Sequence, residues 1–486
     1  MTSYPQDTVA AVRDRTISVR WTLASLSLSM LLASLGTSIA NVGLPTLAQA
    51  SSASFQQVQW VVLAYLLAIT TLIISVGRLG DIAGRRKLLL AGIALFTMAS
   101  ALCGAAPLLS WLIAARAVQG LGAAVMMALA MALVGEAIPK EKTGSVMGLL
   151  GTMSAIGTAL GPSLGGVLIA AFGWRAIFLV TVPFGLLALL LAHHALPADR
   201  PISQSTKPGF DVIGTLVLAF TLGAYALAMT IGRGTFGTTN LLLLLAAIFG
   251  ICLFLFVESR AASPLIHLAM LREPLLRSGL ATSMLVATVM MTTLVVGPFY
   301  LSRGLGLDAA LVGLVMSAGP VVSALAGIPA GRLVDRFGAR YTAVAGLGAM
   351  ATGCLALSLA PEPFGVAGYV MPLVILTAGY ALFQAANNTG VMKDARPDHR
   401  GIVSGLLNLS RNLGLITGAS VMGAVFSFAS AANEIATAGS AAAAAGMTAT
   451  FAVATVLVVI AVAIAATSRV HAAKPSLPDA QGAGRR

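Results

Sequence analysis

Two arginines lie inside otherwise apolar segments of this chain. Arg116 stands in a stretch from about residue 110 to 133, and Arg411 lies about ten residues, or about 15 Å, into the stretch 402–429. Because a guanidinium in hydrocarbon costs about 2.5–3.5 kcal/mol on insertion scales, each should face a hydrated space or a polar partner. For Arg116 the alternative is that its long side chain reaches the nearby end of its segment.

Uncharged polar residues accompany both arginines at helical spacing, since positions three and four apart share one face of a helix. We predict that a small-molecule substrate path is lined by Thr37, Asn41, Arg116, Gln119, Asn387, Asn388, Asn408, Arg411 and Asn412. The alternative is hydrogen bonding between helices with no ligand contact.

Acidic side chains are missing from the interiors of these segments. All sixteen aspartates and glutamates fall in tails, loops or at segment ends. No buried carboxylate is therefore available to hold a cation, and arginines without a counter-ion suit a neutral or anionic compound. The sequence also lacks a histidine or carboxylate cluster for metal binding or acid–base catalysis, and it lacks a G-x-x-x-x-G-K-[S/T] phosphate loop. It predicts no enzyme, no metal and no cofactor.

A charged motif, G-R-L-x-D-x-x-G-x-R, occurs twice, and its copies are 254 positions apart. The copies contain Gly77, Arg78, Asp81, Gly84, Arg85 and Arg86, and then Gly331, Arg332, Asp335, Gly338 and Arg340. Glycine permits the tight turn that such a short connection needs. The aspartate can pair with the cations or face a helix N-terminus.

Membrane-spanning helices must position these residues. The chain is 58% hydrophobic and 9% charged, whereas a soluble domain is about 25% charged. Apolar helices of about 20 residues cross the bilayer and satisfy their own backbone hydrogen bonds. We predict fourteen, at 21–42, 57–79, 87–107, 110–133, 145–172, 176–194, 211–231, 240–257, 279–301, 309–331, 341–360, 366–390, 402–429 and 447–467.

The basic residues predict the orientation of these spans. With the N-terminus inside and the spans alternating, 24 of the 29 lysines and arginines fall on the inner side. This bias predicts a multi-pass protein in the lipid bilayer with both termini cytoplasmic. It also accounts for the net charge of +13 without a nucleic-acid partner.

The repeats predict an all-α integral membrane protein with two pseudo-symmetric six-helix bundles. Gly157 and Gly161 recur 257 positions later as Gly414 and Gly418, close to the spacing of the charged motifs. We predict a tail at 1–20, a bundle at 21–195, a linker with two inserted helices at 196–278, a second bundle at 279–467 and a tail at 468–486. Two matched bundles indicate transport across the bilayer.

A glycine-rich run in the fifth span comprises Gly157, Gly161, Pro162, Gly165 and Gly166. Glycines four apart allow close approach of another backbone, and proline bends the helix. With the two charged motifs and the run from Arg116 to Gly120, it resembles the fourteen-helix drug:proton antiporter branch of the major facilitator superfamily over nearly the whole chain. The resemblance implies that the charged motifs gate the inner side and that the glycine run marks an exporter.

The resemblance also implies that Arg116 tunes the protonation of a nearby acid, yet Gly36 stands where the family usually has an aspartate. It implies a secondary exporter of small organic compounds, such as drugs or metabolites, that is coupled to protons and lies in the bacterial cytoplasmic membrane. Members of the family often work as monomers, but the sequence leaves the oligomeric state open. Gly36 and the arginines without a counter-ion favour an alternative, an importer or facilitator of neutral or anionic small metabolites. The glycine run opposes that alternative.

Overall fold

The computed structural model describes residues 6–137, 140–196, 199, 211–231, 237–261, 272–359, 364–393, 400–430 and 439–467. Within these ranges the side chains of residues 6–19, 135–137, 140–145, 147, 148 and 400–402, and of Ile74, Arg78, Asp81, Ala155, Lys393 and Ser404, lie outside the described part. The described chain is helical and contains no strand, which confirms the all-α fold class.

The first half contains eight helices. They are α1 (Gln6–Val42), α2 (Leu44–Ala50), α3 (Phe55–Ala83), α4 (Arg85–Gly104), α5 (Leu109–Ala137), α6 (Lys140–Phe172), α7 (Ala176–Leu179) and α8 (Thr181–Ala195). Two further helices, α9 (Val212–Thr230) and α10 (Thr238–Arg260), pack against each other, and α9 also packs on α3. These two are the inserted pair that the repeat spacing predicted.

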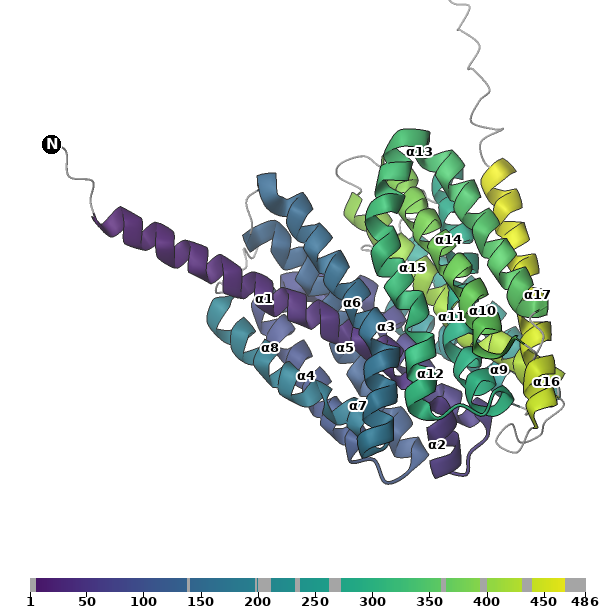
Figure 1. Cartoon of the computed structure of the whole chain (residues 1–486). Coiled ribbons are helices and arrows are strands. Elements are labelled where there is room, and N and C mark those ends of the chain that lie inside the picture. Colours follow the sequence, from purple (N-terminus) through teal and green to yellow (C-terminus); the bar gives the residue numbers. More distant parts are fainter. Residues whose placement is uncertain are drawn as a thin grey trace, which may run out of the picture.

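The second half repeats this arrangement. It contains α11 (Pro274–Phe299), the π-helix η2 (Tyr300–Gly304), α12 (Ala309–Met316), α13 (Ala318–Leu359), α14 (Gly365–Lys393), α15 (Arg400–Thr417), the π-helix η5 (Gly418–Met422), α16 (Gly423–Ala429) and α17 (Ser440–Thr467). Figure 1 shows the two halves as neighbouring groups of helices, purple to teal and then green to yellow.

The number of crossings agrees with the sequence. Thirteen helices of the described chain are long and apolar enough to span a membrane, and one candidate, Ala309–Leu359, has 51 residues. This candidate turns back at Gly338, where φ is 82° and ψ is 156°. Divided at that turn it makes two crossings, and the total becomes the fourteen that we predicted.

The first charged motif is not the loop that we expected. We placed the end of the second span near residue 79, but α3 continues to Ala83 and carries most of the motif in its last turns. The chain turns only at Gly84, where φ is 94°. The helix continues because residues 79–83 contain no proline. They contain one glycine, Gly80, and a helix tolerates a single glycine at a cost of about 1 kcal/mol. Similarly, α1 begins at Gln6 rather than near residue 21, because residues 6–20 contain neither glycine nor proline.

Close helix crossings recur in the two halves. A Cβ on Gly122 of α5 would lie 2.8 Å from the carbonyl oxygen of Gly92 on α4. The corresponding pair in the second half is Gly379 of α14 and Gly346 of α13, where the same distance is 2.6 Å. These pairs are separated by 257 and 254 positions, the spacings of the sequence repeats, so the two bundles are built on one duplicated plan.

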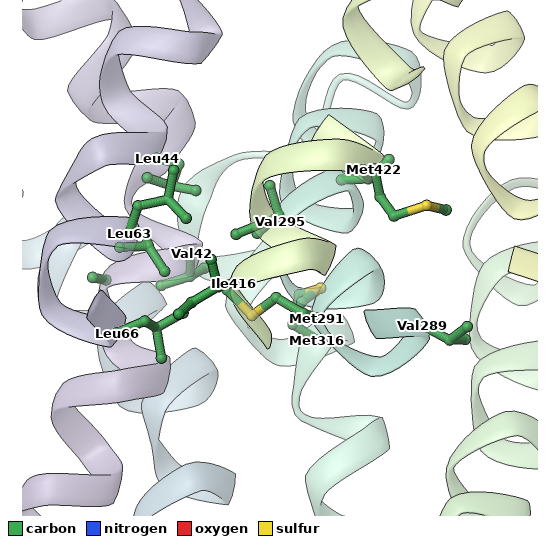
Figure 2. Close-up of a cluster of buried hydrophobic side chains, with 14 of the residues drawn as sticks. Val42, Leu44, Leu63, Leu66, Val289, Met291, Val295, Met316, Ile416 and Met422 are labelled. Atoms are coloured by element: carbon green, nitrogen blue, oxygen red, sulfur yellow. The ribbon is translucent and has the colours of Figure 1, made fainter. Parts of the chain in front are cut away.

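The two halves join at one end of the molecule. Gly84 and Gly338 each follow an even number of crossings, so both lie at the same end, which we call the motif end. At the opposite end, the far end, apolar side chains from both halves form one cluster that includes Val42, Leu66 and Ile416. Figure 2 shows Ile416 directed toward Val42 and Leu66, and in Figure 1 the halves draw apart from α2 toward the turn in α13.

The backbone at Gly338 predicts a clear difference between two glycine substitutions in one motif. Gly338→Ala should lower the free energy of unfolding by about 1–3 kcal/mol, because its φ and ψ lie in a region that is nearly restricted to glycine. Gly331→Ala is the control, since Gly331 is helical with no atom within 4 Å of an added Cβ. Thermal denaturation of the purified variants measures both, and an equal midpoint for the two would contradict the assignment.

Candidate functional site

Arg116 of α5 is enclosed in the first half. Its side chain is 0% exposed, and all of its hydrogen bonds go to uncharged acceptors. Nε donates to the carbonyl oxygen of Val61 on α3 at 2.8 Å, and Nη2 donates to that of Gly36 on α1 at 2.9 Å. Nη1 donates to Oε1 of Gln119 at 2.6 Å. The guanidinium therefore ties α1, α3 and α5 together, and it does not extend to the end of its helix.

An aromatic ring faces the Arg116 guanidinium where the resemblance implies an acid. The guanidinium carbon lies 4.0 Å from the centre of the Tyr65 ring and 5.8 Å from that of Phe178. Such contacts stabilise a desolvated cation by about 2 kcal/mol or more. In the part of the chain that the structure describes, no carboxylate forms an ion pair with Arg116. Its positive charge is offset by dipoles and ring electrons.

Tyr65 also explains why position 36 is a glycine. The Tyr65 hydroxyl donates to the carbonyl oxygen of Ala33 at 2.7 Å, and a Cβ on Gly36 would lie 2.7 Å from the same hydroxyl oxygen. No side chain fits at position 36 unless Tyr65 moves. The residue that replaces the missing acid was not apparent from the sequence, where Tyr65 reads as an ordinary apolar core residue.

The other predicted path residues of the first half are bonded within the bundle. Gln119 extends the hydrogen-bond network of Arg116 to α4, because its Nε2 donates to Ser100 Oγ at 2.7 Å. Asn41 is fully buried, and its Nδ2 donates to the carbonyl oxygens of Thr37 and Ser38 at 3.0 and 3.2 Å. The Thr37 hydroxyl is half-buried and donates to Ala33 at 3.2 Å. Their place in a substrate path stays a prediction.

The predicted path residues of the second half are more open. Arg411, Asn408 and Asn412 of α15 are half-buried, and Asn388 of α14 is exposed. Asn387 donates to the carbonyl oxygen of Gly279 at 3.2 Å and lines a small hollow near Arg340 at the motif end. The structure thus brings Asn408, Arg411 and Asn412 together on one helix and leaves Arg116 and Gln119 enclosed in the other half.

The glycine run of α6 makes two different contacts. A Cβ on Gly157, Gly161 or Gly165 would collide with Leu31, Ser38 or Val42 of α1, so these glycines let two helices of one bundle touch. In the second half Gly414 and Gly418 face Met284 and Thr288 of α11 in the same way. The sequence repeat of these glycines therefore corresponds to a repeated helix contact.

Gly166 of the same run lies where the two halves meet. A Cβ there would lie 2.6 Å from the carbonyl oxygen of Ala309 and 2.8 Å from Cα of Gly313 on α12. A Cβ on Gly313 would in turn lie 2.5 Å from the carbonyl oxygen of Pro162. Residues 162–166 and 309–313 thus form a backbone-to-backbone contact across the far end.

A polar contact closes the other side of the far end. Gln59 of α3 donates from Nε2 to the carbonyl oxygen of Ala419 at 2.8 Å, and Gln56 donates to Ser427 Oγ. Ala419 lies in the π-helix η5, where the altered hydrogen-bond register can leave a carbonyl oxygen open to a side chain. The rings of Phe55 and Phe299 meet edge-on, 4.6 Å apart. The sequence analysis had not singled out Gln56, Gln59 or Gly313.

At the motif end the first motif is held by the segment that follows α8. Asp199 accepts from the backbone N–H groups of Arg86 and Lys87 at 2.8 and 3.2 Å, so it caps the N-terminus of α4. The Arg86 guanidinium also donates to the carbonyl oxygen of His193 at 2.6 Å. The side chains of Arg78 and Asp81 lie outside the described residues.

The remaining motif residues differ in exposure. Arg85 and Gly77 are half-buried, Gly84 is buried, and Gly331 is half-buried. Arg332, Asp335, Gly338 and Arg340 of the second copy are exposed. The first copy is therefore bound to its own half, whereas the second faces outward. Their predicted role as an inner gate stays a prediction.

A family comparison decides the identity of this helical, duplicated architecture. The model of the Major Facilitator Superfamily matches residues 26–419. The chain belongs to this superfamily. It is therefore a membrane transporter and not an enzyme, and its predicted resemblance to this family is confirmed.

Several curated members of the superfamily are similar along most of their length. The chain is 31% identical to the uncharacterized transporter YebQ of Escherichia coli, with 82% of this chain and 87% of that one covered. It is 29% identical to the riboflavin transporter RibZ of Clostridioides difficile, with 83% and 88% covered. It is 31% identical to the multidrug resistance protein Stp of Mycobacterium tuberculosis, with 84% and 75% covered.

Solved structures show the same superfamily fold. A bacterial homologue of the lysosomal transporter Spinster, in an inward-facing and unoccupied conformation, superimposes with a TM-score of 0.70. It shares 17% identity, and the match covers 95% of this chain and 99% of that one. At this identity the likeness describes the fold of the transporter alone.

The Arg116 network predicts that this side chain is structural to the first bundle. Arg116→Leu should lower the free energy of unfolding by about 3 kcal/mol or more, because it removes three buried hydrogen bonds from a charged donor at about 1.5–3 kcal/mol each. Arg411→Leu is the matched control and should leave the midpoint of thermal unfolding nearly unchanged, since Arg411 is half-buried. Equal losses for both variants would contradict this division.

Proposed function

We propose that this transporter is a secondary exporter of small organic compounds that works by alternating access and draws on the proton gradient. The observation that carries the proposal is the far-end closure, in which two duplicated bundles meet at Gly166–Gly313 and at Gln59–Ala419. Such a closure can break and re-form as the bundles rock, without any change inside either bundle. The glycine run and relatives that are named drug efflux pumps support export.

The charge distribution gives this closure a direction. The spans and their basic loops favour a cytoplasmic motif end, with both termini on the same side. In that orientation the structure is closed toward the outside and corresponds to an inward-facing state of a bacterial cytoplasmic-membrane protein. Rocking to the outward-facing state would then separate the far-end contacts and bring the two charged motifs together.

The two far-end contacts are related by the internal duplication. Gln59 precedes Gly313 by 254 positions, and Gly166 precedes Gly423 by 257. Gly423 packs against the Gln59 side chain, as Gly166 packs against Gly313. One contact is thus dry backbone packing and its counterpart is a hydrogen bond through a side chain.

A second candidate function rests on the Tyr65–Arg116 contact. Because Tyr65 takes the space of an acid at position 36, Arg116 has no carboxylate partner to tune within the described residues. This favours a facilitator or importer of neutral or anionic metabolites, in which flux follows the substrate gradient alone. The relative named as a riboflavin transporter shows that close relatives are not all named for drugs.

Transport in sealed inside-out vesicles tests the exporter proposal. Riboflavin and fluorescent dyes of different charge serve as probes, and a proton gradient is imposed with the vesicle interior acidic and electrically positive. An exporter accumulates at least one probe above the external concentration, and a protonophore abolishes the accumulation. Equilibration of a probe without accumulation, unaffected by the protonophore, would support the facilitator and overturn the exporter.

The backbone contact at Gly166 predicts a conformational effect. Gly166→Leu should wedge the far end apart, because even a Cβ would lie 2.6 Å from the Ala309 carbonyl oxygen. We expect spin labels at Phe172 and Leu311, which are both exposed, to move apart and the transport rate to fall about tenfold or more, as for other misplaced contacts in a catalytic cycle.

Gly327→Leu is the control for this measurement. Gly327 lies on an exposed face of α13, with no atom within 4 Å of an added Cβ. Its label distances and transport rate should match those of the parent. An unchanged distance distribution in Gly166→Leu would show that the contact does not hold the far end closed.

A further inference from the structure

Arg411 lies on a face of α15 between the faces that contact its neighbours α11 and α3. Successive residues of an α-helix are rotated by about 100° around the helix axis. The contacts of α15 therefore show which of its faces pack against neighbouring helices. Ser410 donates to the carbonyl oxygen of Leu280 on α11 at 2.5 Å, and Gly414 lies against Met284 of the same helix. Arg411 and Asn408 point away from that side, by about 100° and 160° from Ser410.

Other faces of α15 contact α3 and α9. Ile416 packs in the far-end cluster toward Leu66 of α3, and the Thr417 hydroxyl accepts from Tyr225 of α9 at 3.2 Å. The face with Arg411 and Asn408 lies between the sides that contact α11 and α3. Both side chains are half-buried, which fits a position at the boundary between the two halves.

The depth of Arg411 places it just below the far-end contacts. Ile416 is level with Leu66, and α3 and α15 run in opposite directions, so Arg411 is about level with Thr71. Asp81 lies ten residues farther toward the motif end, or about 15 Å along α3. The charged residues of the first motif are therefore too far away to neutralise Arg411 directly, and the described residues give it no hydrogen bond or ion pair.

The two arginines of the sequence analysis thus have opposite environments. Arg116 is fully buried, with every assigned donor on an acceptor, whereas Arg411 is half-buried with its donors available. A partly desolvated guanidinium is stabilised most by a group that can accept two of its hydrogen bonds and carries a negative charge. Asn408, one turn away on the same face, adds an amide that can donate to the same group.

We propose that Arg411, with Asn408, binds a carboxylate or a similar anionic group of the transported compound, so that the substrates of this transporter are organic anions. The inference rests on the proposed function, because it assigns the substrate class of the same transport path. Arg116 has no part in this binding. It acts only as a link between helices of the first bundle.

A pair of dyes on one scaffold tests this proposal. Carboxyfluorescein is an anionic xanthene dye, and a rhodamine ester is a cation on the same ring system. Fluorescence anisotropy with the purified full-length protein measures the affinity for each. We expect Arg411→Gln to weaken carboxyfluorescein binding by about 10- to 100-fold, the range for loss of hydrogen bonds to a charged group, with no weakening of rhodamine binding.

Two further variants make the result specific. Arg411→Lys keeps the charge and should retain more of the affinity than Arg411→Gln does. Arg260→Gln makes the same exchange at an exposed arginine on α10, whose guanidinium carbon lies 4.3 Å from the Phe256 ring, and should bind carboxyfluorescein like the parent. The thermal midpoints of all variants show whether each is folded.

The outcomes separate this proposal from the exporter proposal. Parent protein that does not bind carboxyfluorescein, or Arg411→Gln that binds it as well as the parent does, overturns the assignment of Arg411. Transport of the rhodamine ester without binding of carboxyfluorescein would overturn it and leave the exporter standing. Binding that depends on Arg411, without accumulation in vesicles, would overturn the exporter and leave the anion site standing.

Discussion

The burial of one positive charge without a carboxylate partner is the constraint on which the first bundle depends. Lipid and packed side chains offer Arg116 no water, so its donors must find acceptors on neighbouring helices. They find the carbonyl oxygens of Gly36 and Val61 and the amide of Gln119, while the Tyr65 ring covers the guanidinium. The two carbonyl oxygens fix the heights of α1 and α3 relative to α5. Position 36 must then remain a glycine, because the tyrosine that stabilises the charge occupies its side-chain space.

Rigid bundles of this kind concentrate movement at the boundary between them. Within each half, glycines allow close backbone contact between helices, as with Gly157 and Gly161 against α1 and Gly414 and Gly418 against α11. Between the halves the contacts lie toward the far end, with backbone packing at Gly166, amide hydrogen bonds from Gln56 and Gln59, and a shared apolar cluster. A rocking motion that breaks only the contacts between the halves leaves the contacts within each half intact. The glycine run of α6 contributes to both, since Gly165 faces α1 and Gly166 faces α12.

The sequence predicts the parts of this structure that lipid and duplication determine. Apolar length fixed the fourteen spans, and motif spacing fixed the pairing of the halves, because both signals are repeated along the chain. The positions of side chains that meet across helices could not be predicted in this way. Tyr65 occupies the side-chain space at position 36, although the two residues are 29 positions apart in the sequence. Gln59 and Ala419, which are hydrogen bonded, are 360 positions apart. Periodicity describes one helix at a time and contains no information about such pairs. The two arginines looked alike in sequence for the same reason.

The contrast between these arginines bears on how transport is driven. An antiporter that protonates an acid beside Arg116 would change the charge of the first bundle during its cycle, but Tyr65 and the backbone carbonyls hold that charge constant. If Arg411 binds an organic anion, the moving charge belongs to the substrate. An anion that leaves a cell with a negative interior gains about 2.3 kcal/mol per charge for each 100 mV of membrane potential. Export can then draw on the electrical part of the proton gradient without a proton-carrying side chain in the first bundle. The absence of an acid at position 36, which first counted against export, is in this way compatible with it.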